Sequence, residues 1–259
     1  IWAPSTYCVD IFRGETHVPV VLIPHIVAPK PPTGIDRLEF GLPDEGFIFL
    51  VMADFRSIAE RKNPLGAIEA FSRAFGSKRE GVFLCLKTMG AHCGHKTMQA
   101  MGSFLGKSDS IIHLDYAFDR SRIDALINAS DCLVSLHRSE GFGLPIAEAM
   151  YLGKPVIATG YSGNMDFMNM ENSFPVRFKL LEIDQNIGPF QKGAHWAEPD
   201  VEHAAELMRK VAGDPNLCAS VGMRAASKIR TDFSLERIGG LVRSRFERII
   251  ADNSALRRR

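Results

Sequence analysis

Five short runs of apolar residues recur along the chain, and a polar or glycine-containing segment follows each of them. They cover residues 47–52, 82–86, 111–114, 132–136 and 156–159. Their apolar side chains are consecutive rather than alternating, which is typical of strands that are covered on both faces. The runs therefore predict five buried strands of one sheet.

Segments with helical spacing lie between and after these runs. Asn63-Pro64 is typical of a helix start, since proline is favoured at the first helical position, and Gly76 is typical of a helix end. Strands that alternate with helices form a parallel sheet. The prediction is an α/β fold, a Rossmann-like parallel sheet with helices on both faces. Further helices are expected at residues 120–130 and 145–152, after a cap at Asp200, and at residues 234–250.

The two ends of the chain differ from this pattern. Residues 1–13 and 19–24 look like strand ends and a connector, and Pro29, Pro31 and Pro32 predict a stiff linker. We therefore divide the chain into residues 1–24, a Rossmann-like domain at residues 25–233, and a terminal helix within residues 234–259. The first residue is Ile1 rather than methionine, so we expect a fragment or a processed product.

Charge and cysteine content narrow the function classes. Lys plus Arg total 31 and Asp plus Glu total 30, a net charge of +1, so nucleic acid is not an expected partner. Five cysteines without a CxxC pair favour a reduced, cytoplasmic protein. No apolar run approaches the roughly 18 residues of a transmembrane helix. Residues 257–259 are arginines, which predict a solvated terminus or, alternatively, a peripheral contact with the inner face of a membrane.

The richest candidate turn follows the fourth apolar run, at residues 139–145. Ligands of open α/β sheets bind beyond the carboxyl ends of the strands. Gly141 and Gly143 allow close approach of the backbone, and the N–H groups of the following helix form an anion site. Glu140 and Glu148 would repel an anion unless they bind another part of the ligand. A nucleotide sugar meets both conditions, because its phosphates can bind the helix N–H groups while its ribose and sugar hydroxyls donate to the two carboxylates.

Two cations, Arg56 and Lys62, follow the first apolar run at a spacing of six residues. Both could reach a diphosphate, whose charge must be neutralised when it leaves as part of a nucleoside diphosphate. The neighbouring Arg61 is not selected. Solvated loop charges are the alternative, and this alternative is stronger for Arg56 than for Lys62.

No metal site is predicted. His92, Cys93 and His95 lie close together, but no second ligand pair completes a site, so we expect a surface loop there. The sequence also contains no Asp-x-Asp, the carboxylate pair that commonly holds a metal-bound nucleotide diphosphate.

For three further positions, the sequence is compatible both with a contact to the ligand and with a purely structural role. They lie in the turns where a ligand is expected, but packing or ordinary turn chemistry explains them equally well. They are His137 beside the candidate sugar pocket, the segment Ser162-Gly163-Asn164 after the fifth run, and Lys87-Thr88 after the second.

The segment from Glu140 to Glu148 resembles the E-x7-E signature of family-four retaining glycosyltransferases, the group 1 transferases of GT-B fold. Residues 153–159, Gly-Lys-Pro-Val-Ile-Ala-Thr, are also similar to that family. So are two segments after the first run, Phe55-Arg56-Ser57 and Arg61-Lys62-Asn63-Pro64. The resemblance covers residues 2–230. It implies two Rossmann-like domains with the active site in the cleft between them. This chain matches the second, donor-binding domain and the end of the first.

The resemblance also implies an activity and roles for residues. The activity is transfer of a sugar from a nucleotide diphosphate sugar, with retained anomeric configuration, to an acceptor that we expect to be a glycan or a lipid-linked saccharide. No metal and no cofactor besides the donor is implied. Arg56 and Lys62 would stabilise the leaving diphosphate, Glu140 would orient the donor sugar, and Glu148 would bind the ribose hydroxyls. The turn Gly141-Phe142-Gly143-Leu144 would bind the donor, with the Gly143 and Leu144 amides on the diphosphate.

The same resemblance makes residues 1–24 a remnant of the first domain and leads the terminal helix back to that domain. We therefore expect exposed apolar surface at both chain ends, self-association, and no transfer by this chain alone. Two alternatives remain. One is another enzyme on the same fold, a sugar-nucleotide epimerase or a glycosyl phosphorylase, although no lysine motif for pyridoxal phosphate is present. The other is a non-catalytic nucleotide-sugar-binding module.

Overall fold

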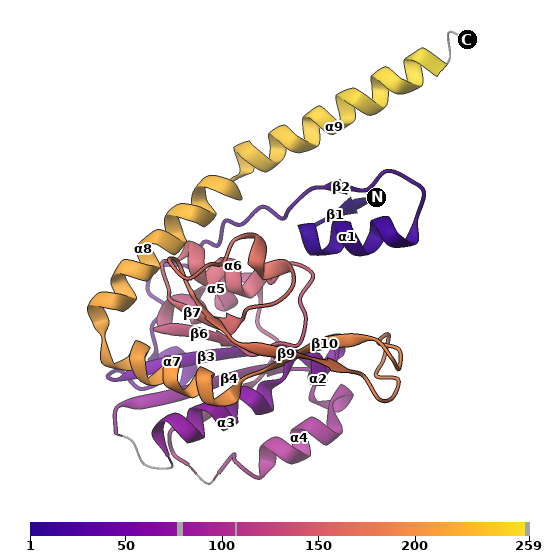
Figure 1. The fold of residues 1–259 in the computed structure, drawn as a ribbon. Helices are drawn as coiled ribbons and strands as arrows, with labels where there is room; N and C mark the ends of the chain where they lie inside the picture. Colours follow the sequence, from indigo (N-terminus) through magenta and orange to yellow (C-terminus); the bar gives the residue numbers. More distant parts are fainter. Residues whose placement is uncertain (77–79, 107, 257–259) are drawn as a thin grey trace.

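A six-stranded parallel sheet forms the centre of the protein (Figure 1). The structure, a computed structural model, describes residues 1–76, 80–106 and 108–256. The strand order is β5-β4-β3-β6-β7-β8, and every neighbouring pair is parallel. The five predicted strands are confirmed, and the short β8 is an addition. The strands are β3 (Phe47–Asp54), β4 (Val82–Met89), β5 (Ile111–Asp115), β6 (Cys132–Ser135), β7 (Val156–Thr159) and β8 (Phe174–Val176).

Helices cover both faces of this sheet, as predicted (Figure 1). The core on one face includes residues of α3, α4 and α7, and the core on the other includes residues of α5, α6 and α8. This arrangement explains the consecutive apolar residues of each strand, because their side chains alternate between two faces that are both covered by helices. The helices are α3 (Pro64–Phe75), α4 (His95–Gly102), α5 (Arg120–Ala129), α6 (Leu144–Tyr151), α7 (Val201–Gly213) and α8 (Pro215–Asp232).

The predicted helix boundaries are confirmed where capping residues marked them. The Asn63 side chain accepts a hydrogen bond from the Gly66 N–H at the start of α3, and Gly76 caps the other end. Asp200 caps α7 by accepting from the His203 N–H. A four-residue helix, α2 (Ala59–Lys62), lies directly before α3. The cations of the Arg-Lys-Asn-Pro segment are therefore helical.

The N-terminal prediction is wrong for residues 6–15, which form a helix rather than a strand end. This helix, α1 (Thr6–Glu15), is capped by the Ser5 side chain. A two-residue parallel pair, β1 (Trp2–Ala3) and β2 (Val21–Leu22), flanks it. Only Val9 of α1 is buried, so the apolar residues of this segment do not mark a helical face, and the cap was the usable signal.

Two more segments differ from the prediction. Strands β9 (Phe178–Glu182) and β10 (His195–Pro199) form an antiparallel ribbon that was not predicted. His92 and Cys93 lie in a 3-10 helix, Ala91–Cys93, and His95 begins α4, so the loop predicted there is largely helical.

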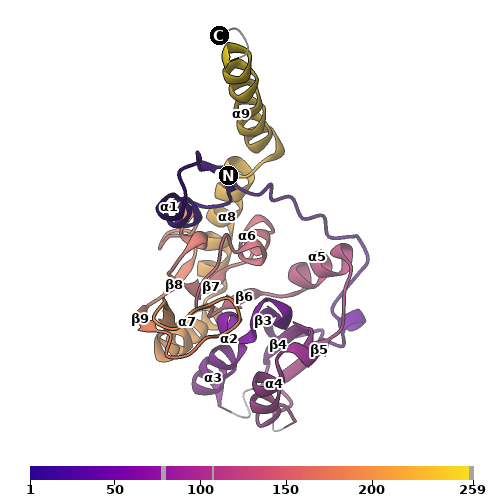
Figure 2. The ribbon, with the colours of Figure 1, turned by 90° about the vertical axis from the view of Figure 1, so that its right-hand side faces the viewer.

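The terminal helix α9 spans Leu235–Leu256, longer than predicted. It projects away from the sheet, beside the N-terminal segment (Figures 1 and 2). Leu235, Leu241 and Phe246 are exposed on it, and Trp2 is exposed beside it. The expected exposed apolar surface at both chain ends is confirmed.

Candidate functional site

The turn between β6 and α6 has a backbone that depends on glycine. Gly143 has a φ of +88° and a Cβ there would lie 3.2 Å from Ile146 Cδ1. The neighbouring loop presses against the same turn, because a Cβ on Gly163 would lie 2.2 Å from the Gly141 oxygen. No side chain of the described residues caps α6. The first N–H groups of α6 therefore remain available to an anion.

The N-terminal segment contacts this turn from outside. Ser5 is fully buried, and its hydroxyl donates a hydrogen bond of 2.5 Å to the Gly141 oxygen. The Thr6 N–H donates to the Asp166 carboxylate at 2.8 Å, in the 3-10 helix Gly163–Asp166 that follows β7. Residues 1–24 are thus part of the structure around the candidate site.

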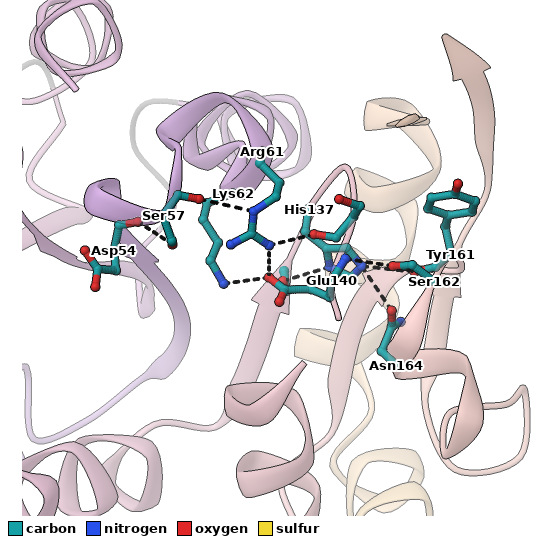
Figure 3. A network of polar contacts seen from close by, with 11 residues as sticks. Asp54, Ser57, Arg61, Lys62, His137, Glu140, Tyr161, Ser162 and Asn164 are labelled. Atoms are coloured by element: carbon teal, nitrogen blue, oxygen red, sulfur yellow. Dashed lines mark hydrogen bonds and ion pairs between the residues drawn. The ribbon is translucent and has the colours of Figure 1, made fainter. Parts of the chain in front are cut away.

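Glu140 is held by two cations of α2 (Figure 3). Its Oε1 lies 2.6 Å from Lys62 Nζ and 3.1 Å from an Arg61 guanidinium nitrogen, and only 11% of the side chain is exposed. Burial acts to raise the pKa of Glu140, but attraction to the Lys62 and Arg61 cations outweighs it and lowers the pKa below its usual value. Glu140 is therefore an ionised, oriented acceptor at neutral pH.

Arg61 contacts Glu140, whereas Arg56 pairs with another carboxylate. Arg61, which the sequence pattern does not select, also donates to the Ser139 carbonyl oxygen at 2.7 Å, so it fixes the turn as well as the carboxylate. Arg56 is 57% exposed and pairs with Asp54 at 2.8 Å. The hydrogen bond from Arg56 holds the pKa of Asp54 below its usual value. The structure brings Lys62 and Arg61 to Glu140 and leaves Arg56 outside this cluster.

Glu148 lies in a separate polar group on α6. Its side chain is 7% exposed and accepts a 2.7 Å hydrogen bond from Arg120, which also pairs with Asp124. Burial raises the pKa of Glu148, and the attraction to Arg120 only partly opposes it. The two glutamates of the E-x7-E spacing therefore differ in partner and in charge preference.

His137 packs beneath the turn rather than lining an open surface. It is fully buried, and burial lowers its pKa. Its Nε2 lies 3.2 Å from the main-chain carbonyl oxygen of Tyr161 and 3.1 Å from Asn164 Oδ1. Two acceptors at Nε2 assign the ring proton to that atom. Neutral His137 thus joins β6 to the loop after β7.

The other two uncertain positions also have internal partners. The Ser162 hydroxyl accepts the Glu140 N–H at 2.8 Å, so this loop orients the glutamate (Figure 3). Buried Lys87 donates to two main-chain carbonyl oxygens, that of Thr88 at 2.7 Å and that of Tyr116 at 2.5 Å. Thr88 donates to Asp115 at 2.8 Å. Lys87 and Thr88 therefore hold the ends of β4 and β5 together.

A cavity lies where the turn between β6 and α6 meets strand β3. Its lining includes Met52 of β3, Lys62, Glu140, Gly143 and Pro145. Residues from three separate segments thus face one space at the carboxyl edge of the sheet. Across the described ranges, His, Cys, Asp and Glu side chains form no group of three or more suited to a metal ion. No helix within those ranges has the length and apolar character needed to cross a membrane.

Comparison with known proteins decides the family. A family model described as "Glycosyl transferases group 1" matches residues 35–228, most of the chain. The chain belongs to the group 1 glycosyltransferase family. This confirms the resemblance, and the match contains both the Arg61–Lys62 segment and the Glu140 turn.

Curated relatives of this group 1 glycosyltransferase chain include the human alpha-1,3/1,6-mannosyltransferase ALG2. The two are 27% identical over 118 residues, which cover 46% of this chain and 23% of that protein. Trehalose synthase of Pyrococcus horikoshii is 26% identical over 116 residues, 44% of this chain and 23% of the synthase. The chain therefore spans about a quarter of each of these relatives.

Solved structures show the same fold. Sucrose-phosphate synthase from Thermosynechococcus elongatus superposes with a TM-score of 0.73 at 19% identity, covering 97% of this chain and 58% of that one. HepE of Anabaena, solved in complex with UDP and glucose, gives 0.73 at 18% identity, covering 95% and 62%. These likenesses confirm the Rossmann-like parallel-sheet fold of GT-B glycosyltransferases.

Proposed function

We propose that this chain is the donor-binding half of a retaining, metal-independent glycosyltransferase. It would bind a nucleotide diphosphate sugar, whose sugar passes to a glycan or a lipid-linked saccharide. The observation that carries the proposal is the buried Lys62–Glu140 ion pair beside the uncapped N-terminus of α6. A cation and free N–H groups suit a diphosphate, and an oriented carboxylate suits sugar hydroxyls.

The diphosphate, the sugar and the ribose of the donor each have a partner in this arrangement. Lys62 and the amides of Gly143 and Leu144 neutralise the charge that develops on the leaving diphosphate. Glu140, kept ionised by its cations, accepts hydrogen bonds from the donor sugar. Glu148 accepts from the ribose hydroxyls. Arg56 joins the diphosphate only after its side chain turns away from Asp54.

Transfer by the whole protein involves more than this chain. The solved relatives are longer, since the chain covers 58% and 62% of two of them. An acceptor would approach the donor from the part of the protein that corresponds to the rest of those chains. One relative is a mannosyltransferase and another binds UDP and glucose, which supports a nucleotide sugar as the donor class.

Calorimetric titration with uridine, guanosine and adenosine diphosphates tests the proposal. We expect one of them to bind, with the same affinity in the presence of a metal chelator, because protein cations and amides supply the phosphate contacts. Lys62→Gln should weaken the binding, whereas Lys192→Gln, a change in the loop of the β9–β10 ribbon, should not. Binding that disappears in chelator would refute metal independence, and the absence of binding to all three would refute the donor site.

A further inference from the structure

Arg138 joins three segments that carry or support the candidate site. Its side chain forms two hydrogen bonds to the Glu198 carboxylate on β10, of 2.7 and 3.0 Å. The same guanidinium donates to the main-chain carbonyl oxygen of Glu60 in α2 at 2.6 Å. It also lies over the Trp196 ring, 5.1 Å from the ring centroid. Arg138 lies two residues before Glu140, so its side chain connects the Glu140 segment, α2 and the ribbon.

The backbone of Arg138 repeats the same connections. Its N–H donates to the Arg61 oxygen at 2.8 Å, and its carbonyl accepts from the Ala197 N–H at 2.9 Å. The carbonyls of two successive α2 residues, Glu60 and Arg61, are therefore fixed by one residue of the opposite segment. Lys62 is the next residue along α2.

The ribbon touches the start of α2 at a second point. A Cβ on Gly188, in the loop between β9 and β10, would lie 2.5 Å from Ile58 Cδ1. Ile58 has a φ of +70°, which a β-branched residue adopts only where its surroundings enforce it. The β9–β10 ribbon thus contacts α2 near its first residue through Ile58 and near its last through Arg138.

We propose that Arg138 is a positioning residue, which sets the α2 cations against Glu140 with the β9–β10 ribbon as its support. The inference rests on the proposed function and extends it to a residue that touches no part of the donor. Lys62 and Glu140 are 78 residues apart, and a 2.6 Å ion pair between them requires their two segments to keep a fixed register. Arg138 provides that register through a planar fork that lysine cannot reproduce.

The test compares a nucleoside diphosphate with the matching nucleoside, both titrated into the same variants. Arg138→Met should weaken diphosphate binding about tenfold, the loss of one well-placed charged hydrogen bond, and leave nucleoside binding unchanged. Arg138→Lys should recover only part of the loss. Arg177→Met is the matched control, because Arg177 lies at the base of the same ribbon and pairs only with Asp200 among the ion pairs described. It should not alter either affinity.

Some results would overturn the positioning role. Unchanged diphosphate affinity in Arg138→Met, or an equal loss for the nucleoside, would do so. If Arg138→Met does not fold, Glu198→Gln decides by the same comparison, because it removes the charge that supports Arg138 and keeps the shape. Its expected effect is a smaller loss restricted to the diphosphate, and no loss would refute the role. Wild-type protein that binds no diphosphate would instead refute the proposed function itself.

Discussion

Lys62 Nζ lies 2.6 Å from Glu140 Oε1, although 78 residues separate the two along the chain. Lys62 is the last residue of α2, and Glu140 belongs to the turn before α6. The pair therefore depends on the parallel order of β3 and β6, whose carboxyl ends lie side by side. In the proposed function, a donor that enters here would meet a cation and a carboxylate already in place.

The two glutamates should separate in binding experiments. Glu148→Ala should weaken nucleoside diphosphate binding by about 1–3 kcal/mol, because ribose hydroxyls lose a charged acceptor. Glu140→Ala should leave that affinity nearly unchanged and weaken only the binding of the sugar-bearing donor. Calorimetry with both ligands measures the difference. Equal losses for the plain diphosphate would show that the two roles are assigned wrongly.

Glu148→Gln should raise stability at neutral pH while it weakens ribose binding. Burial raises the folded-state pKa of Glu148 above 4.5, so protonation of Glu148 favours the fold. That contribution is present below pH 4.5 and is lost as the pH rises through the folded pKa. Glutamine is uncharged at every pH and avoids this loss. Thermal unfolding should show a higher midpoint for the variant at neutral pH and a smaller difference in acid; a lower midpoint at neutral pH would contradict the expectation.

His137 should contribute to unfolding in acid. Burial lowers its folded-state pKa below 6.5. Its contribution to stability is therefore complete above pH 6.5 and is lost as the pH falls through the folded pKa. His137→Gln cannot gain a proton, so its unfolding free energy should fall less between neutral pH and mild acid. Urea titrations over that range provide the measurement, and parallel pH profiles for both proteins would exclude the effect.

Self-association should depend on the apolar surface at the chain ends. The Trp2 and Phe246 rings are 5.5 Å apart and both are exposed. Burial of such a patch between two copies would remove apolar area from water. Phe246→Glu should shift sedimentation velocity profiles toward the monomer, and Met223→Glu, on the exposed side of α8, should not. A monomeric wild-type chain at high concentration would count against self-association.

The sequence predicted elements whose signal is local. Buried strands such as β3 follow from consecutive apolar residues, and α3 follows from Asn63-Pro64, because both signals lie within the element itself. The ribbon strand β9 is different. Most of its residues are exposed, and among the described strands it pairs with β10 alone, so no apolar pattern marks it. Helix α1 was not predicted because only Val9 of it is buried, so no apolar face marks it, and because Ser5 before it is held by the distant Gly141.

The candidate site was predictable to the level of segments rather than of individual cations. Gly143 and Glu140 line the cavity at the carboxyl edge of the sheet, where the sequence placed the candidate turn, whereas Glu148 is buried within α6. Which arginine faces Glu140 depends on competition between partners. Asp54 holds Arg56, whereas the Ser139 carbonyl holds Arg61 beside the carboxylate. Which partner each arginine takes depends on the tertiary arrangement of these groups, so the spacing of residues along the chain does not predict it.

The hydrogen bond from Ser5 to Gly141 has a consequence for the order in which the protein matures. The two residues are 136 positions apart, and a chain made from its N-terminus presents Ser5 to solvent long before Gly141 exists. Contacts between such distant residues form slowly, because a long loop must close first. The candidate turn therefore gains its contact with Ser5 only after the 136 positions that separate the two residues have been made.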